Sequence, residues 1–576
     1  MENEDPSKNT APDSPMLVIA IDELQELTEP RGRHDNAYSP FHLLGRAIKV
    51  FSESRSPGPD AWVVFLSTNS KVTHFAAPAV IHPSQRVLNE GQLIFPPFCL
   101  LQWDTFDEPK NVLSVGNYED AISFGRPLWK SVNSLELYRK PEAMSKFALT
   151  KLINSDVNRI NSAQMISDEM ALAVLGQRFA IDFLFGAWEA VPFVDTSVAS
   201  HMRVLTSTTE DRSWRYTTYP SEPVLSNAAA QFMYMEEQTV SRLSRTLVQN
   251  IVDGLVDAGE VGELMSRLLI LISRDFAAIL NYRIQIAGDS PKSRSPPLSQ
   301  RFPSSHGDFF PYLRPVPLLD VLDILLGLEW LSECKEDIVS AFKRAYISAS
   351  HWNVLSKDIG PLLNVTASDW LKSYFLCGVA VQCRHDQPLI DKVVPILFLN
   401  PAGQYDGMSC WLIQDKNKTK VDSRALRSIE VGHTSIDLDT GKPYVVTCFN
   451  FGVRGLSGEG KEDGTEEGKE EGKEDKTEGK KLKGCRVTMP SRGTHISRAL
   501  RIEVTGLSEE VFPVLKTRYD FARSIIALLQ ATKTIQIPKD STNQALVRVS
   551  LEYASSKPRA EKEAEISRLR SQTVAA

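Results

Sequence analysis

Two apolar runs near the start of the chain are each followed by polar side chains. Leu17–Ile21 is continuously apolar and leads into Asp22 and Glu23, and a second run, 61–66, leads to Asn69. Continuous apolar runs of this length are typical of strands buried on both faces of a parallel sheet. The segment between them has the spacing of a crossover helix, so the pattern predicts a βαβ unit.

The polar residues at the ends of these two strands suggest nucleotide chemistry. Asp22 and Glu23 have the form of a Walker B motif, in which the first carboxylate holds Mg²⁺ and the second polarises the attacking water. Asn69 stands where an ATPase places a sensor of the γ-phosphate. Arg126 is a candidate sensor or arginine finger. The alternative for Arg126 is that it packs against the nearby Trp129 or pairs with an acid at a domain joint.

The phosphate-binding loop that should accompany a Walker B strand is missing. Only 21 residues precede Asp22, they contain no glycine, and the pattern G-x-x-x-x-G-K-[ST] occurs nowhere in the chain. We therefore interpret 16–133 as a truncated P-loop NTPase-like module that follows a disordered tail at 1–15. The chain as written is not expected to bind ATP tightly, and an upstream sequence could complete the site.

A helical module is expected next, over 134–287. Apolar residues recur at three- and four-residue spacing in 163–190 and again in 238–286. We interpret this region as a helical lid or winged-helix-like module, in which His201 is a core histidine and Glu222 caps a helix. Residues 288–317 are rich in Ser, Pro and Arg and are expected to be a linker.

The remaining chain changes from helical to strand-like patterning. A domain is expected over 318–540, with apolar strand-like runs that are listed here: 378–383, 393–399, 410–414, 444–449 and 499–504. It is interrupted by 455–484, whose Gly-Glu-Lys repeats lack apolar side chains and should be disordered. A charged tail follows at 541–576. The whole chain is thus predicted to be an α/β multidomain protein.

A second candidate site lies within this last domain. Asp391 precedes one predicted strand, and Gln414 and Lys416 end another. Alternation along a strand places Gln414 and Lys416 on one side and Asp415 on the other. Asp, then (Asp/Glu/Gln)-x-Lys, is the PD-(D/E)xK arrangement, in which oxygen ligands hold Mg²⁺ and the lysine orients the attacking water. Asp406, in an Asp-Gly turn, is an alternative metal ligand.

Composition limits the possible classes of protein but does not identify a reaction. The 576 residues are 42% hydrophobic with a net charge of −7, which gives no overall basic footprint for nucleic acid. Seven scattered cysteines without a C-x-x-C pair indicate reduced thiols. No signal peptide or apolar run of membrane-spanning length is present, so we expect a cytoplasmic or nuclear protein with no membrane partner.

The order of these segments resembles fungal, mainly basidiomycete, proteins that join an ATPase-like part to a restriction-endonuclease-like part, similar to Crinkler-type NTPase–nuclease modular proteins. The matching pieces are Leu17–Glu23, 65–70, 124–129, 201–203, 221–223, 261–264, Gly378, Gln387, Asp391, Pro395 and 413–417. This resemblance implies a restriction-endonuclease-like fold for 318–540. It also implies Asp391 as metal ligand, Gln414 in a position usually held by an acid, and Lys416 as catalytic lysine.

Two departures from that pattern bear on activity. Gln414 is a neutral amide in place of a carboxylate, which weakens Mg²⁺ binding, and Asp415 is charged where an apolar residue is usual. The preferred hypothesis is a metal-dependent nucleic-acid phosphodiesterase attached to a degenerate ATPase-like module. The alternatives are a non-catalytic interaction or scaffold protein with protein partners, and a nucleotide switch completed by upstream sequence.

Overall fold

The computed structural model describes a mixed α/β protein in ranges separated by gaps. The described residues are 17–22, 27, 40–53, 61–66, 103–104, 111–160, 162–183, 190–208, 215–257, 261–287, 310–327, 336–355, 367–384, 387–416, 429, 441–452, 485–488 and 499–517. The two segments expected to be disordered, 1–15 and 455–484, lie outside these ranges, as do the charged tail at 541–576, Glu23 and Asn69. Among the described helices, none is long and apolar enough to cross a membrane.

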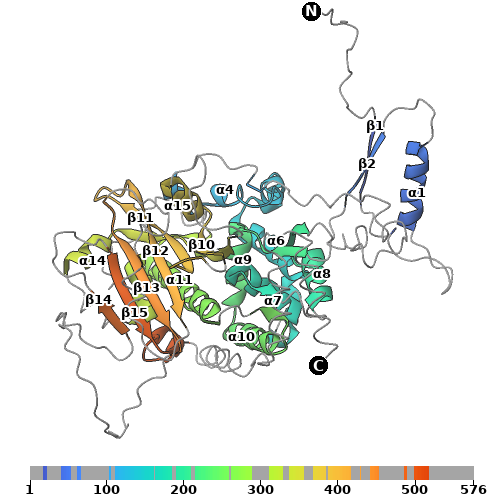
Figure 1. Cartoon of the computed structure of the whole chain (residues 1–576). Helices are drawn as coiled ribbons and strands as arrows, with labels where there is room; N and C mark the ends of the chain where they lie inside the picture. The colour runs from blue at the N-terminus through green and yellow to red at the C-terminus, as the bar shows by residue number, and fades with distance from the viewer. Residues whose placement is uncertain are drawn as a thin grey trace, which may run out of the picture.

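The predicted βαβ unit forms at the amino-terminal end. Strand β1 (Leu17–Ile21) pairs in parallel with β2 (Ala61–Phe65), and helix α1 (Pro40–Glu53) connects them. The expected burial of β1 is wrong, because Leu17, Val18 and Ile19 are 46%, 56% and 41% exposed. A two-stranded sheet with one helix leaves apolar side chains uncovered, and Figure 1 shows this unit to the side of the main body.

Helices dominate the chain from 111 to 287. The helices and strands there are α4 (Tyr118–Ala121), α5 (Leu128–Val132), α6 (Pro141–Ile153), α7 (Asp168–Phe179), β3 (Asp182–Phe183), α8 (Ala190–Ser200), β4 (Val204–Thr208), β5 (Arg215–Thr218), α9 (Pro223–Met233), α10 (Glu237–Val252), β6 (Val256–Asp257) and α11 (Val261–Ala287). β4 and β5 form an antiparallel hairpin, and β3 pairs with β6. Short 3₁₀ turns lie at Val112–Ser114, Glu136–Tyr138, Val157–Arg159 and Ala163–Met165.

A nine-stranded mixed sheet occupies the carboxyl-terminal half. Its main strand order is β14-β15-β13-β12-β11-β10-β9, with β8 on β11 and β7 on β8. The elements are β7 (Val316–Pro317), α12 (Leu318–Leu326), α14 (Glu336–Phe342), β8 (Ala345–Ile347), β9 (His351–Val354), α15 (Ala367–Leu376), β10 (Val379–Gln382), β11 (Lys392–Leu399), β12 (Tyr405–Lys416), β13 (Tyr444–Asn450), β14 (Cys485–Thr488) and β15 (Ala499–Thr505), with 3₁₀ turns at Pro311–Leu313 and Pro513–Thr517.

The direction of the strands determines which strand ends meet. β10, β11 and β12 are successive antiparallel neighbours, and β13 then runs parallel to β12 and β15 parallel to β13. Gly378, between α15 and β10, has a φ of +68°, and a Cβ there would lie 3.0 Å from Ser350 Oγ, so glycine is needed at this junction.

Helix α11 covers one face of this sheet. Its buried leucines share one hydrophobic core with residues of β11, β12, β13 and β15, including Trp411, Ile413 and Phe449. Trp352 of β9 donates from Nε1 to the carbonyl of Arg267 in α11 at 3.1 Å. The opposite face packs on α15 through Leu371 and Phe375 in a second core. The helical region and the sheet are therefore joined through one continuous apolar interior.

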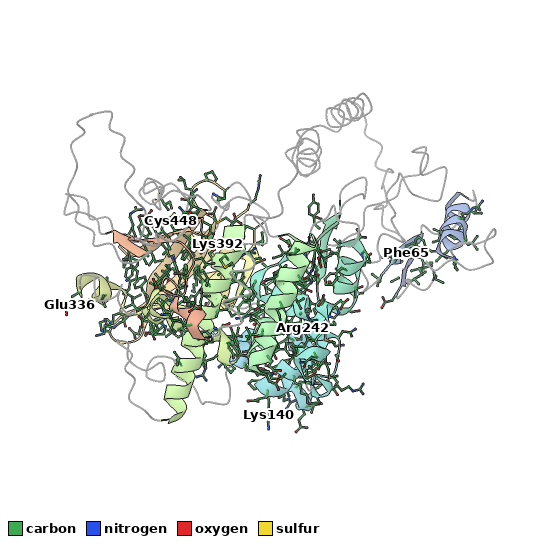
Figure 2. All side chains as sticks on the ribbon, turned by 90° about the horizontal axis from the view of Figure 1, so that it is seen from below. Phe65, Lys140, Arg242, Glu336, Lys392 and Cys448 are labelled. Carbon is green, nitrogen blue, oxygen red and sulfur yellow. The ribbon has the colours of Figure 1, made fainter. Side chains whose placement is uncertain are left out.

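The two halves lie side by side in both views. Figure 1 places the sheet, in yellow to red, beside the teal and green helices, and Figure 2 shows Lys392 and Cys448 on the sheet side and Arg242 and Lys140 on the helical side. The expected linker at 288–317 ends earlier than its composition suggested. Residues 310–317 include buried Phe310, Leu313 and Val316, and Val316 pairs with Ile347 of β8.

Candidate functional site

The structure brings Asp391, Gln414 and Lys416 to the same edge of the sheet. Asp391 directly precedes β11, and the other two residues end β12. Because these strands are antiparallel, the start of β11 lies beside the end of β12, where Asp391 N donates to the Ile413 carbonyl at 2.9 Å. The strand alternation places Gln414 and Lys416 on the face that packs on α15.

Backbone and side-chain hydrogen bonds fix the orientation of Asp391. Its Oδ2 accepts a hydrogen bond from the backbone N–H of Asp415 at 2.5 Å, which ties the carboxylate to β12. Its carbonyl oxygen accepts from Gln382 Nε2 at 3.0 Å. The side chain is half-buried, so a carboxylate is held at the sheet edge without being closed off from solvent.

Gln414 presents an oxygen that suits a cation. The residue is 8% exposed, and its Oε1 is a buried acceptor without a hydrogen-bond partner in the described part of the chain. Buried polar atoms in native proteins nearly always have a partner, and amide oxygens are ligands of hard divalent cations. Asp391 and Gln414 are therefore two residues of this edge that could hold a divalent cation. The described ranges contain no group of three or more His, Cys, Asp and Glu side chains suited to a metal.

Asp415 points to the other face of the sheet, and its charge is matched there. Its Oδ2 forms an ion pair with Lys392 Nζ and accepts a hydrogen bond from Ser266 Oγ of α11 at 3.0 Å. Burial and the Asp391 charge raise the pKa of Asp415 to about 6, while Lys392 opposes this shift. The unusual charge in the motif is thus explained by a buried partner. Asp406 lies at the opposite end of β12 and pairs with Lys442 at 2.6 Å, away from Gln414.

Of the four residues predicted to contact the nucleotide, the structure describes Asp22 and Arg126. Asp22 follows β1 and is exposed, and Glu23 and Asn69 fall outside the described ranges. The Arg126 guanidinium forms two hydrogen bonds from Nε and Nη2 to the buried Glu222 carboxylate, the shortest at 2.6 Å. The sensor role is therefore corrected to the alternative interpretation, a pair between arginine and an acid.

Several of the short sequence motifs meet at the Glu222 side chain. Trp129 Nε1 donates to its Oε2 at 2.7 Å, and Arg126 also donates to the carbonyl of Met202 at 2.8 Å. Glu222 is the N-cap residue of α9, as predicted, but its side chain forms no capping hydrogen bond to the helix. His201 is a core histidine, as predicted, with Nδ1 2.9 Å from the Leu152 carbonyl and a pKa lowered by burial.

Sequence analysis missed a Ser–His pair between the two halves. His351 Nε2 lies 3.0 Å from Ser221 Oγ, and its Nδ1 lies 3.0 Å from Ser350 Oγ. Burial, together with the positive charges of Arg178 and Arg274, lowers the pKa of His351 to about 3. An imidazole held neutral in this way is a poor general base near pH 7. The pair therefore joins the helices to β9 instead of activating a nucleophile.

His351 should make the stability of the fold depend on pH. Its pKa in the folded state is about 3, below the ordinary 6.5, so the unfolded state binds a proton first as the pH falls. Stability is fully present above pH 6.5 and is lost toward pH 3, by about 1.4 kcal/mol per pH unit well below 6.5. Urea unfolding at pH 7.5, 6.5 and 5.5 gives the free energy of unfolding at each pH. This free energy should fall more steeply with decreasing pH for the wild type than for His351→Gln. Equal slopes in the two proteins would remove His351 as the cause.

Comparison with known proteins gives one partial match. A family model described as a domain of unknown function, DUF8736, matches residues 162–281, from the turn before α7 to the later turns of α11. The search of curated proteins and the search of solved structures found no match. Two side chains of the matched region contact residues next to the candidate site. Ser266 donates a hydrogen bond to Asp415, and Glu263 accepts one from Gln382.

Proposed function

We propose that the chain is a metal-dependent phosphodiesterase of nucleic acids with a restriction-endonuclease-like sheet. The observation that supports this most is the placement of an acid at the start of β11 beside Gln-x-Lys at the end of β12. Three antiparallel strands followed by a parallel strand, β13, produce this placement. It is the arrangement that the PD-(D/E)xK chemistry requires, reached by residues 23 and 25 positions apart in the chain.

Each residue has a separate role in this proposal. Asp391, oriented by the Asp415 backbone N–H, and Gln414, through its unpartnered Oε1, would hold the cation. Mg²⁺, when bound, lowers the pKa of a coordinated water and polarises a phosphoryl oxygen. Lys416 lies two residues beyond Gln414 on the same face and is half-buried, so its ammonium can orient the attacking water and offset the charge of the phosphate. On the opposite face of the sheet, the ion pair of Lys392 with Asp415 positions the end of β12.

A non-catalytic interaction protein is the second candidate. The observation in its favour is that Asp391 and Gln414 together supply one carboxylate, which is a weak set for Mg²⁺. The nucleotide-switch hypothesis, which needs upstream sequence or a partner chain to supply the phosphate-binding loop, stays a prediction. The ATPase-like origin of 16–133 likewise stays a proposal, supported by the βαβ unit formed by β1, α1 and β2.

Cleavage by the whole chain tests the proposal directly. End-labelled single-stranded DNA, duplex DNA and RNA are incubated with the protein and Mg²⁺ or Mn²⁺. We expect cleavage with metal and at least about a 100-fold lower rate for Lys416→Ala and for Asp391→Asn. Lys442→Ala is the matched control, since it removes a lysine at the other end of β12. Cleavage that survives either substitution would place the catalytic site elsewhere. Absence of cleavage by the folded wild type with either metal would favour the interaction protein.

A further inference from the structure

Asp391, the predicted metal ligand, follows a turn that is unfavourable for its sequence. Leu389 has a φ of +71°, and the backbone N–H of Ile390 donates to the Pro388 carbonyl at 2.9 Å. A hydrogen bond between residues i and i+2 with a positive φ at the residue between them defines the γ-turn that is rare and strained. Bulky residues seldom adopt this conformation, whereas glycine adopts it freely. The chain therefore enters β11 through a turn that is locally unfavourable.

A buried amide holds the other side of this entry into β11. Gln382, which ends β10, lies opposite Lys392 in the register between β10 and β11 and is 5% exposed. Its Nε2 donates to the Asp391 carbonyl at 3.0 Å and to Glu263 Oε2, in the first turn of α11, at 3.0 Å. The Asp391 carbonyl also accepts from the backbone N–H of Cys383 at 2.8 Å. One side chain thus connects α11 to the backbone of the predicted metal ligand.

The Gln382 amide is itself an unfavourable group to bury. Its Oε1 has no hydrogen-bond partner within the described ranges. Buried polar atoms nearly always have a partner, so an unsatisfied acceptor needs an explanation. An apolar side chain of similar length, such as methionine, would fill the same space without an unsatisfied acceptor. The amide is therefore better explained by the groups that its Nε2 holds than by its packing.

Both unfavourable features act on the placement of Asp391. Strained turns and unsatisfied buried groups persist where the surrounding structure over-determines them, and they cluster at functional sites. The Asp391 carbonyl is bonded to β10 and Cys383, and its N–H and Oδ2 are bonded to β12. A ligand that is ordered before the cation arrives loses less conformational entropy on binding it.

We propose that Gln382 and the turn at Leu389 position Asp391 for a divalent cation, with Gln382 linking the site to α11. This inference rests on the proposed phosphodiesterase function. Gln382 shares the α11 face with Lys392, so it acts through Asp391 and does not contact the cation. Residues that orient a metal ligand typically change metal affinity by about 10- to 100-fold when they are lost. The alternative is that the bond from Gln382 to Glu263 only joins α11 to the sheet.

Calorimetric titration of the whole chain with Mn²⁺ separates these two roles. Gln382→Met keeps the length of the side chain and removes its hydrogen bonds, so we expect Mn²⁺ binding to weaken about tenfold. Gln177→Met is the matched control, because Gln177 of α7 is also buried, also has an unpartnered Oε1 and also donates to a carbonyl, that of Pro220. This control should bind Mn²⁺ as the wild type does. Thermal unfolding without metal should show similar shifts of the midpoint in the two variants.

The turn at Leu389 supplies a second pair of variants. Leu389→Gly allows the backbone to leave the γ-turn, so Mn²⁺ binding should weaken at least about threefold. Ala180→Gly is its control, since Ala180 also has a positive φ, of 50°, at the end of α7. Asp391→Asn, which changes the predicted ligand itself, should abolish measurable binding. Circular dichroism confirms that each variant is folded at the temperature of the titration.

The outcomes distinguish failure of the positioning role from failure of the site. If Asp391→Asn abolishes Mn²⁺ binding while Gln382→Met and Leu389→Gly bind as the wild type does, the positioning role is wrong and the proposed metal site stands. Weaker binding in one of these two variants retains that residue and excludes the other. If Gln177→Met and Ala180→Gly weaken binding equally, the effect is a general loss of structure. If the folded wild type binds no Mn²⁺, the proposed function and the positioning role fail together.

Discussion

A fragment that begins at residue 310 and therefore lacks α11 is expected not to fold. The face of the sheet that α11 covers includes Trp411, Ile413 and Phe449, which are all fully buried in the complete protein. Exposing this face would reduce the free energy of unfolding by about 1.5–3 kcal/mol for each large apolar side chain. The loss summed over a few such side chains exceeds the usual net stability of a domain. The fragment should show no cooperative thermal transition and should bind a hydrophobic dye.

A second fragment provides the matched control. Beginning at residue 99, it lacks β1, α1 and β2 but retains α11 and both hydrophobic cores, whose members lie between Val112 and Leu515. It should unfold cooperatively, at a temperature close to that of the complete chain. A cooperative transition in the fragment from 310 would show that the sheet is stable without α11 and would contradict the expectation.

Replacing Asp275 by alanine should be among the most damaging single substitutions. The Asp275 carboxylate forms a buried ion pair with Arg178, lies 3.4 Å from Arg274 Nη1 and accepts a hydrogen bond from Tyr234 at 2.9 Å. All three charged side chains have no exposed surface. Burial lowers the pKa of Arg274 to about 10, and the Asp275 charge opposes this shift. Asp275→Ala would leave two buried guanidinium groups without their acid, at a cost of about 3–5 kcal/mol in the free energy of unfolding.

Asp168→Ala is the comparison for that measurement. Asp168 also pairs with an arginine, Arg242 at 2.9 Å, but its side chain is 46% exposed. Water screens such a pair, so its loss should cost about 1 kcal/mol or less. Denaturant unfolding of both variants gives the difference. A similar loss for Asp168→Ala and Asp275→Ala would mean that burial does not govern the strength of these pairs.

The strands of the sheet were largely predictable because their side chains are apolar on both faces. β11 (Lys392–Leu399) and β13 (Tyr444–Asn450) follow apolar runs closely, and both have buried side chains in each of the two cores. β8 (Ala345–Ile347) and β9 (His351–Val354) were missed, since neither lies in one of the predicted strand-like runs. They are short, and His351 is a polar residue whose burial depends on partners far away in sequence.

The candidate site was predictable only in part, for a related reason. The shared face of Gln414 and Lys416 follows from strand alternation alone. The pairing of Lys392 with Asp415 depends on the register between β11 and β12, and the Arg126–Glu222 pair joins residues 96 positions apart. Hydrophobic pattern and motif spacing do not specify which residues from two strands or two distant segments will lie opposite one another. For the same reason, a lone charge such as Asp415 appeared to be a defect until its partner was placed.

The position of α11 limits how this protein could have evolved by exchange of segments. The region that matches the family model ends at residue 281, within α11, yet that helix donates from Ser266 to Asp415 and packs on the sheet outside the match. A segment that moves between genes as an independent module must have a hydrophobic core of its own. Residues 162–281 instead share one hydrophobic core with the strands that follow. Recombination between these two stretches would separate a helix from the surface it covers, so we expect descendants of this chain to inherit the two together.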